Sequence, residues 1–501
     1  MDEPQNDGSA SGLSRGRRML VLGICCLSLL IVGLDTTIVN VALPAIRSSL
    51  HASVSELQWT IDAYTLVLAS LLMLAGSTAD RIGRRRIFRA GLVVFSLGSL
   101  LCGLAPSLEL LIAARVLQAI GGSMLNPVAM SIIRNVFDDP RERAQAIGAW
   151  GAVFGLSMAL GPVVGGALVD TVGWRAVFFV NVPIGVIAFV LTTLYVPRSR
   201  AARARRLDPV GQVLVILALA SLTYSIIEAP RSGWTSPGTL GLFAFSLACF
   251  VGLVGYELRR REPLLEMRFF RSVPFAGAST IALFTFASQG GFLFLNTLYL
   301  QGVRHFSPLH AGLFMLPMAG MVLVFAPISG RLVSRHGARP SLVSAGAVLL
   351  IASLMLTRLT PTTSIGYLLI AYFLFGLGSG LINPPITNTA VSGMPPSQAG
   401  VAAAIASTSR QVGMTLGVAV LGAISGGMIS GTIGPSFAAA THPAWWICAG
   451  LGLLSLTLGV LTTTRWAEKT ARETAERFRE SESRPGAAPP PRYKQRELAA
   501  R

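Results

Sequence analysis

Two aspartates and one arginine lie inside stretches of sequence that are otherwise apolar. Asp35 lies within residues 19–41, Asp62 within 57–79 and Arg115 within 109–133. An ionised group at bilayer depth costs at least about 2.5 kcal/mol, so such residues usually serve proton relay or substrate contact. A nearby arginine favours a charged carboxyl group and loss of water favours a neutral one. We therefore predict that the three residues couple proton movement to transport, with a static Arg–Asp pair as the alternative.

The elements that must position these residues are transmembrane helices. The chain has 501 residues, 52% hydrophobic and 13% charged, with a mean hydropathy of +0.62. Apolar segments of a length that spans a bilayer recur, which predicts an all-α polytopic membrane protein. We count fourteen: 19–41, 57–79, 87–106, 109–133, 144–168, 175–196, 208–228, 238–258, 274–299, 309–332, 340–358, 365–387, 398–429 and 443–464.

The formal charge of +18 is distributed unevenly between the loops. Arginines cluster before the first segment and after every second one, whereas the intervening loops hold about one each. This pattern places both termini in the cytoplasm, and it gives the basic charge a role other than nucleic-acid binding. With the amino terminus inside, the three charged residues lie about 7–9 Å below the outer face, at about 1.5 Å per residue.

A short internal sequence repeat indicates that the chain has two related halves. Gly76, Arg81, Gly83 and Arg85 have counterparts 254 residues later, beginning with Gly330 (330 − 76). Two halves with a site between them are a common transporter architecture. The predicted division is a tail (1–18), a six-helix half (19–196), a basic loop with two inserted helices (197–260), a second six-helix half (261–464) and a charged, partly disordered cytoplasmic tail (465–501).

Several classes of protein are excluded by what the sequence lacks. Lys469 and Lys494 are the only lysines and neither follows a glycine, so no phosphate-binding GxxxxGK loop exists. The five histidines form no metal-ligand cluster, and the five cysteines fall in apolar segments as small core residues. No loop is long enough for a catalytic domain. We predict no enzymatic activity, no metal and no cofactor, with the proton gradient as the energy source.

Five motifs occur in order along the first half. The first segment ends LDTTIVNVALP, a basic turn covers 76–85, and the fourth segment contains RVLQAIG from Arg115. The fifth segment contains several glycines and one proline. The sixth begins with Trp174-Arg175, followed by Phe178, Asn181 and Pro183. Together they strongly resemble the major facilitator superfamily, in its fourteen-span drug:proton antiporter branch of the EmrB/QacA type. The resemblance covers nearly all of 19–464.

The resemblance implies roles for two groups of residues in conformational change. The basic turn serves as a cytoplasmic latch in this family, and the fifth-span motif characterises exporters. Glycines at four-residue spacing also let another helix approach closely. The residues concerned are Gly76, Asp80, Arg81, Gly83, Arg84, Gly155, Gly161, Pro162, Gly165 and Gly166.

A substrate cavity is expected to be mostly apolar with a few aromatic, amide or charged groups. The second half has no aspartate or glutamate between Glu266 and Glu468, and Arg410 is its only clearly deep charge. Proton coupling must therefore rest on the first half. The candidate cavity residues are Asn40, Tyr64, Gln118, Gln289, Phe292, Asn296, Asn383, Arg410 and Gln411.

These observations predict a proton-coupled exporter of drugs or toxic amphipathic compounds in the bacterial plasma membrane. The expected partners are small-molecule substrates, protons and membrane lipids, with the chain working as a monomer. A dedicated exporter of one antibiotic or metabolite, serving self-resistance, stays open. A membrane sensor that does not transport is a third alternative, disfavoured by Asp35, Asp62 and Arg115.

Overall fold

The computed structural model describes residues 13–200, 207–260, 263–395, 398–427 and 433–483, and all regular elements in these ranges are helices. Their bounds are α1 (Arg15–Leu50), α2 (Val54–Ile82), α3 (Arg84–Leu104), α4 (Leu108–Val136), α5 (Pro140–Thr171), α6 (Ala176–Phe179), α7 (Asn181–Tyr195), α8 (Pro209–Ser232), α9 (Pro237–Glu257), η2 (Met267–Arg271), α10 (Val273–Leu298), η3 (Tyr299–Val303), α11 (Pro308–Phe314), α12 (Leu316–His336), α13 (Arg339–Leu356), α14 (Ile365–Val391), α15 (Ala399–Gly426), α16 (Ser436–Ala440), α17 (His442–Leu461) and α18 (Arg465–Ser483).

Thirteen spans in the described part of the chain are long and apolar enough to cross a membrane. The predicted all-α membrane fold is therefore confirmed. A further long helix, α15, has 28 residues and packs between α2 and α10, but Arg410 and Gln411 lower the apolarity of its middle. The count of fourteen spans stays a prediction.

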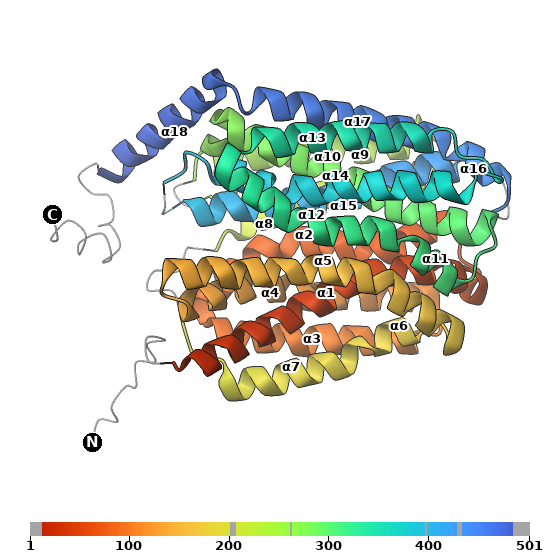
Figure 1. The fold of residues 1–501 in the computed structure, drawn as a ribbon, viewed down its shortest axis with the longest axis horizontal. Coiled ribbons are helices and arrows are strands. Elements are labelled where there is room, and N and C mark those ends of the chain that lie inside the picture. Colours follow the sequence, from red (N-terminus) through yellow and green to blue (C-terminus); the bar gives the residue numbers. More distant parts are fainter. Residues whose placement is uncertain (1–12, 201–206, 261–262, 396–397, 428–432, 484–501) are drawn as a thin grey trace.

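The long helices run roughly parallel to one another and form two bundles, α1–α7 and α10–α17, which lie one above the other in Figure 1. We call the end where α1 begins and α17 ends the basic end, because Arg15, Arg84 and Arg465 lie there, and the other the opposite end. Helix α8 packs against α2 from one half and α15 from the other. The pair α8–α9, which the sequence predicts to be inserted, thus meets the junction between the halves through α8.

Two glycines at the basic end repeat the same backbone turn in both halves. Gly83 ends α2 with φ +121° and Gly337 ends α12 with φ +78°, and they are separated by 254 residues (337 − 83). Only glycine adopts such conformations without strain. The repeated glycines of the sequence therefore end corresponding helices in the two halves.

Replacing Gly83 with alanine should destabilise the protein by about 1–3 kcal/mol, because a Cβ is strained at this φ and ψ. Space is not the cause, since the nearest atoms to that Cβ are 3.7 Å away. Thermal inactivation in detergent tests this, with Gly255→Ala in open space on α9 as the control. Equal stability of the two variants would contradict the strain.

The first part of the predicted tail forms helix α18, and one face of this helix is buried. Ala467, Ala471 and Phe478 are buried, and the Phe478 ring lies 5.3 Å from that of Phe269 in η2. The many charged residues of the segment make this apolar face hard to recognise from the sequence. The predicted disorder beyond 483 falls outside the described residues.

Candidate functional site

Asp35 is held by three side chains from two other helices of the first half. Arg115 Nη1 on α4 donates to Asp35 Oδ2 at 2.6 Å, and both side chains are almost fully buried. Gln118 Nε2 and Asn181 Nδ2 donate to Asp35 Oδ1 at 2.8 and 3.1 Å. Both amides also donate to Ser99 Oγ on α3. This Asp35 network therefore satisfies both carboxylate oxygens and ties α1, α3, α4 and α7 together.

The Arg115 guanidinium is further enclosed by α2. Its Nε donates to the Thr60 carbonyl oxygen at 3.2 Å, and its Cζ lies 4.2 Å from the centre of the Tyr64 ring. Phe178 offers a second ring at 5.7 Å. A buried ion pair is tolerated when hydrogen bonds satisfy its remaining donors and acceptors. The arrangement is that of a fixed ion pair inside one half.

Asp62 lies on a different face of α2 and does not join this network. Thr60 and Tyr64 face Arg115, and Asp62 is two residues from each, about 200° around the helix. Among the described residues its hydrogen-bond partner is Thr65 Oγ1, which donates to Oδ1 at 3.4 Å, and Oδ2 is buried with no partner there. The predicted cluster of three is therefore split into an ion pair and a lone carboxyl group.

The face of α2 that carries Asp62 packs on the second half. Gln58 Nε2 donates to the Val418 and Ala419 carbonyl oxygens at 2.9 Å each, and Thr415 Oγ1 donates to Thr65 Oγ1 at 2.9 Å. Asp62 lies between these two contacts along the helix. It therefore occupies the α2–α15 seam, where the two halves meet.

The fifth predicted span, α5, uses its small residues on two faces. A Cβ on Gly161 or Gly165 would overlap Thr37 or Ile38 of α1, so these two allow close packing within the first half. A Cβ on Gly166 would lie 2.5 Å from the Pro308 carbonyl oxygen of α11, in the second half. Close approach of helices through small residues is therefore confirmed, and it occurs both within a half and between halves.

The contacts between the halves along α5 are confined to one part of the helix. Gly155 approaches Leu323, and the Pro162 carbonyl oxygen approaches Gly312, on one face of α5. Gly148 lies on the same face nearer the basic end, where it is exposed with open space around it. At these glycine positions α5 thus meets the second half toward the opposite end and not at Gly148.

Comparison with known proteins agrees with this architecture. The family model described as Major Facilitator Superfamily matches residues 25–418. The chain belongs to this superfamily. Helix α15 and the two glycine faces of α5 can therefore be described as parts of a major facilitator fold.

The curated relatives of this superfamily member include resistance proteins of bacteria. It is 38% identical over 421 residues to "Multidrug resistance protein Stp" of Mycobacterium tuberculosis, covering 83% of this chain and 78% of the relative. It is 39% identical to "Tetracenomycin C resistance and export protein" of Streptomyces glaucescens, with 88% and 82% covered. "Methylenomycin A resistance protein" of Streptomyces coelicolor is 37% identical, with 78% and 82% covered.

Solved transporter structures share the fold at low sequence identity. A bacterial homologue of the human lysosomal transporter Spinster, inward-facing and unoccupied, gives a TM-score of 0.62 at 18% identity, covering 92% of this chain and 99% of its own. A bacterial homologue of the human peptide transporters PepT1 and PepT2 gives 0.63 at 13% identity, with 91% and 99% covered. The chain is a multi-pass transporter of the bacterial plasma membrane.

The α5–α11 contact predicts the effect of one substitution in this major facilitator protein. Valine at Gly312 would overlap the Pro162 carbonyl group, and overpacking of this kind costs about 1–3 kcal/mol. Gly312→Val should therefore disfavour closure of the opposite end and lower transport about tenfold or more. Labelling of Ala52→Cys, a buried position at that end, by an impermeant maleimide should become faster. Unchanged labelling would show that α11 does not close this end.

The predicted latch loop contacts the start of the next helix. Asp80 on α2 pairs with Arg84 of α3 at 3.1 Å, within the same turn, and the Arg84 amide donates to the Ser199 carbonyl oxygen at 3.0 Å. Arg81 is exposed, and Gly76 approaches Pro127 of α4. The loop thus fastens α2, α3 and the segment after α7 within one half in this conformation.

Four residues predicted to line a cavity are instead packed inside the halves. Tyr64 and Gln118 surround Arg115, as described above. Phe292 stacks 4.1 Å from Phe375, and Asn296 Oδ1 accepts from Tyr372 Oη at 2.8 Å, both within the second half. Aromatic and amide side chains serve packing as well as binding, and sequence offers no way to separate the two uses.

The other predicted cavity residues lie nearer the boundary between the halves. Gln289 Nε2 of α10 approaches Met158 Sδ of α5 at 3.4 Å, which joins the two halves. Asn383, Arg410 and Gln411 are half-buried. Asn40 is buried, with its Nδ2 bound to a carbonyl oxygen of its own helix and its Oδ1 unpartnered among the described residues.

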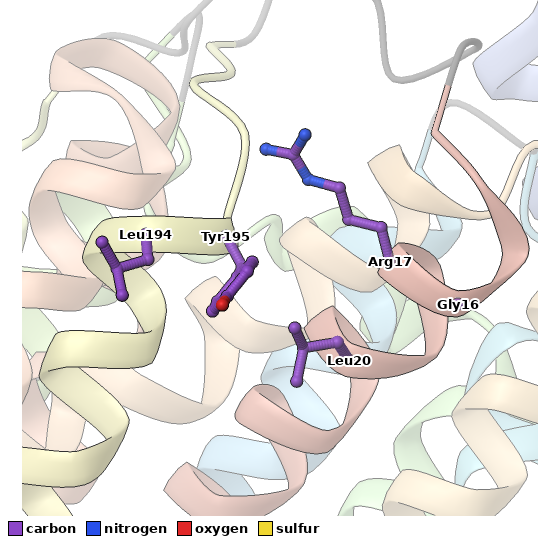
Figure 2. Close-up of a pocket in the computed structure, with 5 residues that line it drawn as sticks. All are labelled: Gly16, Arg17, Leu20, Leu194 and Tyr195. Carbon is purple, nitrogen blue, oxygen red and sulfur yellow. The ribbon is translucent and has the colours of Figure 1, made fainter.

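A pocket of about 380 Å³ lies away from this boundary. Figure 2 shows its lining, where Gly16, Arg17 and Leu20 of α1 face Leu194 and Tyr195 of α7 at the basic end. An arginine beside apolar side chains at the membrane surface suits a lipid headgroup and chain. This pocket is therefore separate from Asp62 and the α2–α15 seam.

Proposed function

We propose that this protein is a proton-driven exporter of drugs or toxic amphipathic compounds. Substrate would enter from the cytoplasm at the basic end and leave at the opposite end as the halves rock about their shared boundary. Both termini would then be cytoplasmic. The resistance proteins among its relatives support export, and the lone Asp62 on the seam is the observation that supports proton coupling.

Asp62 is suited to exchange a proton because it can do so without breaking an ion pair. Its Oδ2 has no partner in the described structure, and it faces the other half. Opening of the α2–α15 seam would admit water to this carboxyl group, and closure would exclude it. Asp35, by contrast, is the fixed counter-charge of Arg115 and would hold α1 against α4.

The proton gradient is sufficient for this task. One proton moving through 100 mV releases about 2.3 kcal/mol, and one pH unit adds about 1.4 kcal/mol. Their sum corresponds to roughly a 500-fold gradient of a neutral compound per proton. No nucleotide is needed.

A dedicated exporter of one antibiotic is the second candidate. Two of the relatives carry the name of a single compound, tetracenomycin C or methylenomycin A. A growth panel of dyes and antibiotics separates the two candidates. Broad protection indicates multidrug export, and protection against one compound indicates a dedicated exporter.

Everted membrane vesicles test the proposed function itself. A pH gradient is formed by respiration and followed with an acridine dye, and candidate compounds are then added. We expect a transported compound to dissipate the gradient in vesicles that contain the protein and not in control vesicles. Substrate movement that persists at full rate after an uncoupler has collapsed the gradient would refute proton coupling.

A further inference from the structure

The helices α10–α17 of the second half contain a deep positive charge and no aspartate or glutamate. No aspartate or glutamate lies between Glu266 and Glu468, and Arg410 is the twelfth of the 28 residues of α15. A buried arginine in a membrane protein normally pairs with a carboxylate or lines a cavity. Arg115 in the first half follows the former pattern, whereas Arg410 has no carboxylate of its own half within the membrane.

The contacts of Arg410 leave one of its three guanidinium nitrogens buried without a partner among the described residues. Nη2 donates to Thr387 Oγ1 of α14, and Nε is buried with no partner among the described residues. A guanidinium has five N–H donors, and each buried donor without a partner is costly. Arg410 forms no ion pair with any of the described residues.

Arg410 lies on a face of α15 that turns away from α8 and toward α14, where its side chain meets Thr387. Ala419 of the same helix packs with Ile226 and Ile227 of α8, which covers α15 from outside. Arg410 precedes Ala419 by nine residues, a rotation of about 180° around an α-helix. Its face is therefore opposite the one covered by the inserted pair.

Thr387, which contacts Arg410, has further polar residues near it in the sequence of α14 and α15. Thr387 and Asn383 are four residues apart and so lie on one face of α14. Gln411 follows Arg410 directly, and all of these residues are half-buried. An arginine with neighbouring hydroxyl and amide groups is suited to a carboxylate, phenolate or enolate.

We propose that Arg410 binds an anionic group of the exported compound, so that acidic amphipathic molecules are substrates of this protein. This inference rests on the proposed export function and names the substrate class. One monovalent anion leaving in exchange for one proton moves two charges, whereas a monovalent cation exchanged for a proton moves none. Export of anions should therefore respond to the membrane potential, and export of cations should not.

Two xanthene dyes of opposite charge, fluorescein (anionic) and rhodamine 123 (cationic), provide a matched test in everted vesicles. The variants are Arg410→Gln, which removes the charge, and Arg410→Lys, which keeps it. Arg358→Gln is the control, because it removes an exposed arginine from the same half. Protein amount and monodispersity in detergent are measured for each, so that misfolding is detected separately.

We expect wild-type protein to accumulate fluorescein, and Arg410→Gln to lower that rate at least tenfold while rhodamine 123 changes less than twofold. Arg410→Lys should keep part of the fluorescein rate, and collapsing the membrane potential with valinomycin should slow fluorescein alone.

An equal loss of both dyes in Arg410→Gln would overturn the inference, and would favour a pairing of Arg410 with Asp62 in another conformation. Uptake of rhodamine 123 without fluorescein by wild type would also overturn it but leave export standing. If neither dye nor any compound of the drug panel is moved, the export function itself fails.

Discussion

Asp62→Asn is expected to abolish proton-coupled export, with at least a hundredfold loss of substrate-induced proton flux. Asparagine keeps the size of the side chain but cannot take up or release a proton. Since Asp62 has no ion-pair partner in the described structure, its removal leaves no unpaired charge behind. The variant should therefore fold and still exchange labelled for unlabelled substrate across proteoliposomes, a step that needs no net proton movement.

Glu228→Gln is the matched control for this prediction. Glu228 is also a carboxylate close to α2, but it lies on α8 and accepts from Trp59 Nε1 at 3.3 Å. We expect its proton flux to stay within about twofold of wild type. If Asp62→Asn dissipates a pH gradient as well as Glu228→Gln does, Asp62 is not the coupling group.

Arg115→Met is expected to cause the largest loss of stability. It leaves Asp35 buried with its charge uncompensated, and breaking a buried pair in this way costs about 3–5 kcal/mol. Thermal loss of the monodisperse protein peak in detergent measures the effect. The double variant Arg115→Met with Asp35→Asn should recover much of the stability, because no unpaired charge then remains.

Arg18→Met provides the comparison with an exposed pair. Arg18 and Glu142 also lie 2.5 Å apart, but their side chains are 24% and 36% exposed. Solvent screens such a pair, so its loss should cost at most about 1 kcal/mol. Equal effects of Arg18→Met and Arg115→Met would mean that the Asp35 network is not a structural centre of the first half.

Sequence predicts the fold well here because bilayer thickness and hydropathy set the length of each helix. The charged residues within apolar segments were also found this way, since Asp35, Asp62 and Arg115 stand out against their surroundings. The Arg115–Asp35 pair could be anticipated from opposite charge at similar depth. Depth alone, however, gives no rotation about the helix axis, which is why Asp62 was grouped with them.

The uncharged residues that bind Asp35 are harder to predict from the sequence. Asn181 belongs to the motif that opens the sixth span, yet nothing in that motif indicates that it binds Asp35. Ser99 had no signal at all, since an isolated serine is common in transmembrane helices. Conversely, Phe292 and Asn296 suited a cavity by residue type but bind neighbours within their own half. These assignments depend on helix rotation, which requires the packed structure.

Purified protein in proteoliposomes gives the most direct test of proton-coupled export through Asp62. An internal pH dye and a transported compound are followed together after a pH jump, in wild type and in Asp62→Asn. We predict that wild type moves protons and substrate in opposite directions at a fixed ratio, and that Asp62→Asn moves neither in response to the jump. Substrate movement in Asp62→Asn that follows the pH gradient as in wild type would contradict the account.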